Sequence, residues 1–245
     1  MRFAGARRRP PAGGAILSTL LCRLLLLTSL SSPATAYTPL SDASLKLIPA
    51  VPPADFDIHT PHEGLLGPLL VPRVPGTPGS EQAQQHFANF FATQLPKWKV
   101  DWQNTTARTP ATGDRQVPFR NLIVRRDPPW VTAGNVGDVG RLTLVAHYDS
   151  LYRPEGFIGA TDSAAPCAML LHAARAVEQA LETRWADVLA SGNADFEDPM
   201  GVQILLLDGE EAWVSWSAED SLYGARYVRG LGDDTANPLV ESGNI

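Results

Sequence analysis

Residues 202–207 read Val-Gln-Ile-Leu-Leu-Leu, and Asp208-Gly209-Glu210-Glu211 follows them directly. A continuous apolar run of this length is typical of a strand that is covered on both faces of a sheet. A second buried strand is predicted at residues 142–147 (LTLVAH), and residues 165–185 between the two runs carry apolar side chains at helical spacing. Strand, helix and strand in this order, joined by a long crossover, predict a βαβ unit of an α/β fold.

Further elements are predicted on either side of this unit and within its crossover. Apolar residues at helical spacing indicate an amphipathic helix over residues 81–95, with Ser80 as its N-cap. Alternation at 119–125 predicts another strand, while the glycine-rich stretch 133–140 and the acidic stretch 190–199 predict loops, the first of them hairpin-like. Residues 37–80 are rich in Pro and Gly, which favours an arm that wraps a surface over long regular elements.

The first 36 residues have the composition of a secretory signal peptide. Basic residues come first, an apolar run covers residues 15–30, and Ala34-Thr35-Ala36 forms a small-residue cleavage pattern. Arg23 divides the apolar run into halves that are each too short to cross a bilayer, so no stable membrane insertion is expected. We therefore expect a secreted protein, with an uncleaved anchor in the Golgi membrane as the alternative.

The net charge limits the classes of binding partner, and one modification motif bears on the cellular route. Cleavage after residue 36 would remove five Arg and no acidic residue, leaving 15 basic residues against 26 acidic ones and a net charge of −11. A chain this acidic is a poor candidate for binding nucleic acid or anionic lipid surfaces. Asn104-Thr105-Thr106 is an N-glycosylation sequon, which fits a secretory route if the segment is exposed.

Acidic residues directly follow the predicted buried strands. His147 ends the predicted strand at 142–147 and Asp149 follows it, and Asp162 lies across a loop. Glu210 and Glu211 follow the predicted strand at 202–207. Carboxylates in such places are costly unless a metal, a cation or solvent receives them, and the carboxyl ends of strands are where ligand sites of α/β folds gather. Three clusters at one sheet edge point to a shared metal. Adjacent residues in extended chain point to opposite sides, so one Glu could bind the metal while its neighbour acts as a general acid/base.

Structural roles remain open for each of these residues when it is taken alone. The Glu pair could cap a helix or face solvent, and Asp162 could begin a helix. His147 could equally be a hydrogen-bonding residue at a strand end or a metal ligand. The spacing does not decide between these roles.

Four longer motifs, in order along the chain, resemble the glutaminyl-peptide cyclotransferase family, within the zinc aminopeptidase-like peptidase superfamily. They are RVPGTPGS at 73–80, AHYDS at 146–150, GATDSAAPCAM at 159–169 and DGEEAWVSWSAEDSLYGARY at 208–227. The resemblance implies a single domain over residues 81–245 with a mixed central β-sheet flanked by helices. It also implies an enzyme that cyclises the N-terminal glutamine of peptide or protein substrates to pyroglutamate and releases ammonia.

The resemblance further implies the role of each site residue. Asp162 and Glu211 would bind one Zn²⁺ per chain, and Glu210 would be the catalytic acid/base. His147 is not expected to bind the metal in this family, so His147 and Asp149 would have supporting roles.

One part of the family pattern is missing from this sequence. Family members continue further and supply a third zinc ligand, a His on a late loop, but nothing after Tyr227 resembles that segment. We therefore expect a chain truncated at its C-terminus that binds zinc weakly and cyclises poorly or not at all. The alternatives are a zinc aminopeptidase or peptide hydrolase of the same superfamily, with two metals, and an inactive truncated paralogue that only binds peptide N-termini.

Overall fold

The computed structural model describes residues 41–46, 50–60, 63–192 and 199–230. The chain divides into two compact units, residues 1–50 and residues 51–245. In the first unit, Asp42–Lys46 forms a short exposed helix, α2. The predicted signal peptide at residues 1–36 lies outside the described residues.

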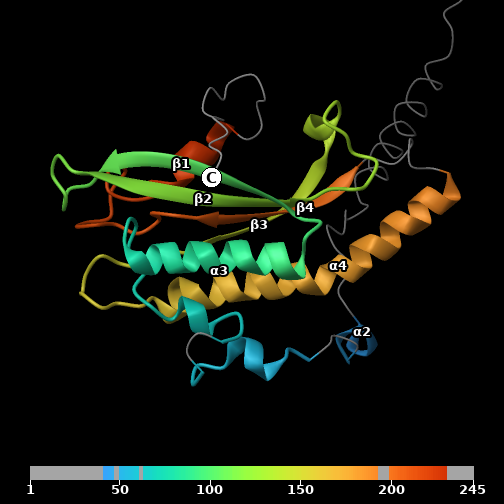
Figure 1. The fold of residues 1–245 in the computed structure, drawn as a ribbon, viewed down its shortest axis with the longest axis horizontal. Coiled ribbons are helices and arrows are strands. Elements are labelled where there is room, and N and C mark those ends of the chain that lie inside the picture. Colours follow the sequence, from blue (N-terminus) through green and yellow to red (C-terminus); the bar gives the residue numbers. More distant parts are fainter. Residues whose placement is uncertain (1–40, 47–49, 61–62, 193–198, 231–245) are drawn as a thin grey trace, which may run out of the picture. The chain divides into compact units, whose positions relative to one another are not determined.

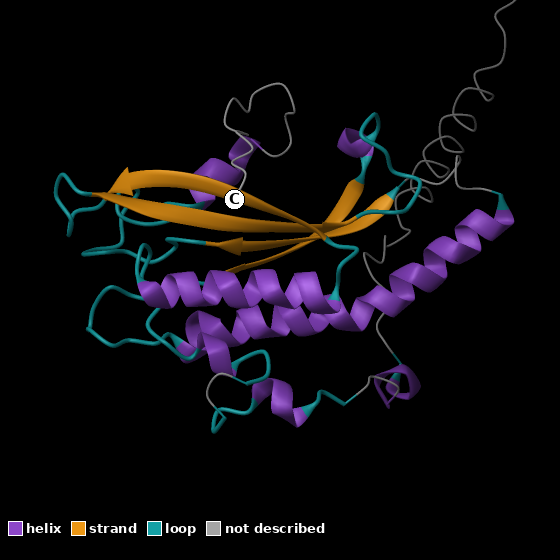
Figure 2. Cartoon of the chain, viewed as in Figure 1, coloured by secondary structure: helices purple, strands orange, loops and turns teal. Residues whose placement is uncertain are grey.

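A four-stranded mixed sheet organises the second unit (Figure 2). Its strands are β1 (Lys99–Arg108), β2 (Gln116–Arg126), β3 (Gly140–His147) and β4 (Met200–Leu207), in the order β1-β2-β4-β3. β3 and β4 run parallel, and the other two neighbouring pairs are antiparallel. The crossover from β3 to β4 contains the long helix α4 (Ala165–Ser191), so the predicted βαβ unit and the mixed sheet are confirmed.

The helices α3 (Pro78–Gln94) and α4 lie side by side on one face of the sheet (Figure 1). Between them and the sheet lies the larger hydrophobic core, to which β2 and β4 contribute Leu122, Val124, Ile204 and Leu206. α3 begins at Pro78 with Thr77 as its N-cap, so the prediction of Ser80 as the cap is wrong. Pro is favoured in the first turn, where its missing N–H is not needed, and this moves the start of the helix forward.

The other face of the sheet carries a smaller apolar cluster. Val117 and Phe119 from β2 pack there against Trp213 and Tyr223 from the segment that follows β4. The rings of Phe119 and Tyr223 stack with centroids 4.8 Å apart and planes 5° from parallel. This contact fixes the segment after β4 to the sheet.

Short helices complete the described chain. They are the 3-10 helices η1 (Pro53–Phe56), η2 (Gly67–Leu69), η3 (Val136–Asp138) and η5 (Ala225–Gly230). The segment η4 (Ala160–Ala164), directly before α4, is kinked, with non-helical backbone angles at Asp162 and Ser163.

Two predictions about the strands are wrong. The stretch 133–140 is not a hairpin, because β4 lies between β2 and β3 in the sheet. β3 is not buried on both faces, since it lies at the edge of the described sheet, where Leu142 is 61% and Val145 is 53% exposed. Its apolar composition, which resembles that of β4, concealed this difference.

β1 was not predicted from the sequence. Its residues, KVDWQNTTAR, are mostly polar, and none of them is fully buried. The strand forms because all ten of its residues pair with β2. Backbone pairing of this kind leaves little trace in side-chain composition.

Candidate functional site

The candidate site lies where the parallel strands β3 and β4 end. His147 is the last residue of β3 and is paired with Leu207, the last residue of β4. Gly209 then turns the chain with φ of 70°, and a Cβ at this position would lie 2.3 Å from the ring of Phe119. Only glycine fits such a turn without strain. The turn brings Glu210 and Glu211 back over the end of β3.

Asp149 connects the two strand ends. Its side chain is fully buried, and its two oxygens accept the backbone N–H groups of Glu210 and Glu211, each at 3.0 Å. The same carboxylate lies 3.2 Å from Nδ1 of His147. Asp149 therefore holds the backbone that carries both glutamates and orients the imidazole at the same time.

His147 lies between carboxylates. Its Nε2 is 2.9 Å from an oxygen of Asp162 and 3.9 Å from an oxygen of Glu210. Burial lowers its pKa, but the hydrogen bond and charge of Asp149, the hydrogen bond to Asp162 and the charge of Glu210 outweigh burial and raise the pKa to about 9. At neutral pH both ring N–H groups consequently donate, one to Asp149 and one to Asp162.

Glu210 and Glu211 do not point to opposite sides of an extended chain as expected. One ligand atom from each of them and one from His147 lie within 4.8 Å of one another. Burial, and then the charge of Asp149, raises the pKa of Glu211 to about 7. Burial also raises the pKa of Glu210, although the nearby imidazolium opposes the shift.

Asp162 reaches the site from the loop before α4. Its side chain is 76% exposed and meets His147, and it is not part of the compact group of three. The loop turns at Gly159, with φ of 51°, and a Cβ there would lie 2.3 Å from the carbonyl oxygen of Asp162. The peptide bond between Asp162 and Ser163 is cis.

This arrangement suits a divalent cation. Carboxylates, and an imidazole that has lost a proton, are ordinary ligands of zinc and similar metals, and here two carboxylates and one imidazole converge from the ends of two adjacent strands. Burial is the largest cause of the raised pKa values of the two glutamates, and the carboxylates of Asp149 and Asp162 add an excess of negative charge that the imidazole of His147 offsets only in part. A cation bound between them would relieve this excess.

Asp220 holds the loop that follows the two glutamates, a role that the sequence did not predict. Its carboxylate accepts the backbone N–H groups of Trp213, Val214 and Ser215, each at 2.9 Å, and the hydroxyl of Tyr223 at 2.7 Å. The N–H of Leu222 donates to the carbonyl of Glu210. The only sequence signal was the position of Asp220 inside the last of the four motifs.

The comparisons with known proteins agree with these observations. Residues 132–237 match peptidase family M28, and this segment contains His147, Asp149, Asp162, Glu210 and Glu211. The chain is 36% identical over 188 residues to the glutaminyl-peptide cyclotransferase-like protein of Bos taurus, an alignment that covers 75% of this chain and 44% of that protein. It is 37% identical over 177 residues to the glutaminyl-peptide cyclotransferase of the same species, covering 71% of this chain and 44% of the relative.

The chain is a relative of the glutaminyl-peptide cyclotransferases. A solved structure supports this relationship: the glutaminyl cyclase of Macrostomum lignano matches with a TM-score of 0.50 and 30% identity, over 68% of this chain and 43% of that one. The resemblance indicated by the four motifs is thereby confirmed. This chain spans 44% of the length of the two bovine members of the family.

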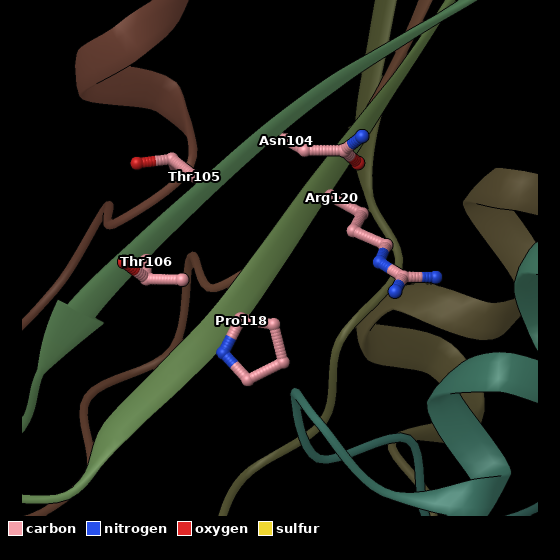
Figure 3. A pocket seen from close by; sticks show the side chains of 5 residues that line it. All are labelled: Asn104, Thr105, Thr106, Pro118 and Arg120. Atoms are coloured by element: carbon pink, nitrogen blue, oxygen red, sulfur yellow. The ribbon is translucent and has the colours of Figure 1, made fainter. Parts of the chain in front are cut away.

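Two further predictions concern glycosylation and membrane insertion. Asn104 of the sequon is exposed on β1 and lines a pocket of about 470 Å³ with Thr105, Thr106, Pro118 and Arg120 (Figure 3). Among the helices of the described ranges, none is both long and apolar enough to cross a membrane.

Proposed function

We propose that this chain carries the acid/base and metal-binding carboxylates of a zinc-dependent glutaminyl-peptide cyclotransferase. The observation that carries the proposal is the convergence of Glu210 and Glu211 with His147 at the ends of adjacent parallel strands, where the imidazole also meets Asp162 at 2.9 Å. The relationship to the cyclotransferases supplies the reaction: an N-terminal glutamine becomes pyroglutamate and ammonia leaves.

Glu211 and Asp162 would hold the zinc, as the family resemblance implies. Glu211 also belongs to the compact group of possible ligands, and Asp162 meets the imidazole of that group. When bound, zinc would act as a Lewis acid toward the γ-carboxamide oxygen of the substrate glutamine.

Glu210 would move the proton. The α-amine of the substrate attacks the carbonyl carbon, Cδ, of its own side-chain amide, so that one C–N bond forms, the bond from Cδ to the amide nitrogen breaks, and no water is consumed. Glu210 would take a proton from the attacking amine and deliver it to the departing ammonia. Its raised pKa suits this exchange, since an acid/base works best when its pKa is near the working pH.

Asp149 and His147 would keep the glutamates in place. Asp149 accepts the N–H groups of both glutamates, and the imidazole stands between Asp162 and Glu210. Neither residue needs to touch the substrate for this role. Their contribution is to limit the movement of groups that must act in a fixed geometry.

The deciding experiment measures ammonia release from a peptide that begins with glutamine, with Zn²⁺ added and with mass spectrometry of the product. We expect only a slow loss of one ammonia from the peptide, in line with the poor cyclisation expected of this chain, and, with Glu210→Gln, a rate lower still by about two orders of magnitude or more. Glu182→Gln, a change at the far end of α4, serves as the matched control and should keep the rate. An intact peptide at the end of the reaction would contradict a cyclotransferase activity of this chain and would favour an inactive paralogue.

A peptide hydrolase is the second candidate, and the match of residues 132–237 to peptidase family M28 favours it. The same reaction mixtures separate the two activities. A hydrolase would release a free amino acid from an unblocked peptide, would consume water, and would bind two metals per chain.

Secretion and glycosylation are further parts of the proposal. The exposed position of Asn104 on β1 supports its use as an acceptor. Expression in a eukaryotic secretory host should give a protein whose mass falls on treatment with a peptide N-glycosidase. Asn104→Gln and Thr106→Ala should both abolish the shift, whereas Thr105→Ala keeps the sequon and should preserve it. No shift in the wild-type chain would contradict this assignment.

A further inference from the structure

Arg73 is an arginine that the proposed chemistry does not use, although it is completely buried. It belongs to the RVPGTPGS motif, its exposed fraction is 0%, and it is the largest fully buried side chain among the described residues. Within the described ranges it forms no salt bridge. A buried charge without an ion-pair partner is costly, so its environment must compensate in another way.

Backbone carbonyl groups provide that compensation. Nε donates to the carbonyl of Tyr148 at 2.6 Å, Nη1 to that of Ile158 at 2.7 Å, and Nη2 to that of Gly159 at 3.2 Å. The carbonyls of Leu69 and Val71, in the segment just before Arg73, also lie within hydrogen-bond distance of Nη1, so that its two N–H groups are shared among three acceptors. One guanidinium therefore binds three separate stretches of chain.

Two of these stretches carry the site. Tyr148 stands directly before Asp149, and the turn at Ile158 and Gly159 leads into Asp162. The backbone N–H of Arg73 donates in addition to the hydroxyl of Ser150, at 2.8 Å, on the other side of Asp149. Arg73 thus forms hydrogen bonds with the residues on both sides of Asp149 and with the backbone at the beginning of the loop that carries Asp162.

Its charge also faces the acidic group. Burial lowers the pKa of Arg73, while its electrostatic interactions with Cys167 and then with Asp149 oppose this shift. The guanidinium remains protonated in a protein at neutral pH. A permanent cation therefore interacts with the buried carboxylate of Asp149.

We propose that Arg73 is a positioning residue of the candidate site, which fixes the segments that carry Asp149 and Asp162 relative to each other. The inference rests on the proposed function only in calling this place a site; the contacts themselves do not depend on the reaction. Through Asp149, the effect extends to Glu210 and Glu211, whose N–H groups its carboxylate accepts.

Arginine is needed for this role and lysine would not replace it. The guanidinium presents five donors in a planar fork, whereas an ammonium is a single point with three donors on a flexible stem. Lysine at position 73 could reach one or two of the carbonyls of Tyr148, Ile158 and Gly159, but could not span all three. Arg73→Lys keeps the positive charge but loses the planar arrangement of hydrogen-bond donors.

The test is amide hydrogen exchange on the whole metal-free chain, compared between wild type and Arg73→Lys. We expect exchange at the N–H groups of Glu210 and Glu211 and at Ala164, which bonds to the carbonyl of Gly159, to accelerate at least about tenfold more than at Leu205 in β4. Arg126→Lys is the matched control, because Arg126 is also buried but lies at the other end of the sheet. It should leave the ratio of site exchange to strand exchange unchanged.

A second variant keeps the proposal testable if Arg73→Lys does not fold. Ser150→Ala removes only the acceptor of the Arg73 N–H and should give a smaller acceleration at the same amides. Uniform acceleration over site and strands, or none at the site in either variant, would overturn the proposal. The exchange measurement uses neither substrate nor metal, so its result is separate from the success or failure of the cyclotransferase assay.

Discussion

Acidic side chains lie at both ends of the β3–α4–β4 unit, but they have cationic partners at one end and mostly acidic neighbours at the other. At the amino end of β4, Glu178 and Glu182 on α4 face Arg126, and Lys97 bonds to Glu182 at 2.7 Å. Trp98 also donates its Nε1 to Glu178 at 2.7 Å. At the carboxyl end of β4, Glu210 and Glu211 face each other and one imidazole.

The pKa values show the difference. The hydrogen bond from Lys97, followed by the charges of Arg126 and Lys97, lowers the pKa of Glu182 despite the opposing effect of burial. Burial and neighbouring carboxylates raise the pKa of Glu210 and Glu211. The same residue type therefore marks a structural ion pair at one end and a candidate site at the other. Unmatched charge, and not acidity alone, is the useful signal.

The largest expected effect of this contrast concerns metal binding. Glu211→Gln should weaken Zn²⁺ binding by at least about tenfold, since even a group one step removed from a metal has an effect of that size. Glu182→Gln, whose partners are cations, should leave the affinity unchanged. Calorimetric titration of both variants and the wild type measures this. Equal affinities in all three proteins would show that Glu211 does not bind zinc.

Stability should change in opposite directions at the two ends. Glu178→Gln removes a partner of Arg126, whose side chain is only 8% exposed, and should cost about 2 kcal/mol of unfolding free energy. Glu210→Gln in the metal-free chain removes one of several like charges and should raise the unfolding free energy by up to about 1 kcal/mol. Urea denaturation in the presence of a chelator measures both. A loss of stability in Glu210→Gln would contradict the idea that its charge is unmatched.

Asp220 tests whether a carboxylate near the site can still have a purely structural role. Three backbone N–H groups and the hydroxyl of Tyr223 lower its pKa and outweigh the effect of burial. Because the folded pKa is depressed, the stabilisation is present above the unfolded value of about 4 and is lost as the pH falls through the folded value. Asp220→Asn should cost about 2 kcal/mol at pH 7 and progressively less in acid.

The control for this experiment is Glu219→Gln, because Glu219 is the exposed neighbour of Asp220. Its unfolding free energy should follow that of the wild type at every pH. A difference between wild type and Asp220→Asn that stayed constant down to strongly acid pH would mean that the lost stability did not come from the charged carboxylate.

The sequence predicted the parts of the fold that depend on local pattern. The apolar runs of β3 and β4 and the helical spacing of α4 established the βαβ unit, and the rule for strand ends placed His147 and Glu210 at one edge. The edge position of β3 could not be predicted, because its apolar run looks like that of a covered strand. β1 was missed because its pairing with β2, and not its composition, makes it a strand.

Within the site, residue types were easier to predict than their arrangement. The expectation that Glu210 and Glu211 diverge assumed extended chain, whereas one ligand atom of each lies within 4.8 Å of the other and of His147. Arg73 and Asp220 were missed as positioning groups because their partners are backbone atoms, which every residue carries. A hydrogen bond between Arg73 and the carbonyl of Gly159, 86 residues away, leaves no pattern in the sequence.

The smallest expected effect concerns the exposed ion pair at the amino end of β4. Lys97 and Glu182 form an exposed pair, with 61% and 35% of their side chains accessible, so solvent and salt screen their attraction. Lys97→Ala should change the unfolding free energy by less than about 0.5 kcal/mol, and the change should vanish at high salt. Urea denaturation at low and high ionic strength, run beside Glu178→Gln, measures this. A cost as large as that of Glu178→Gln would mean that the exposed pair and the buried one act as a single network, and that Arg126 depends on Lys97 to hold Glu182 in place.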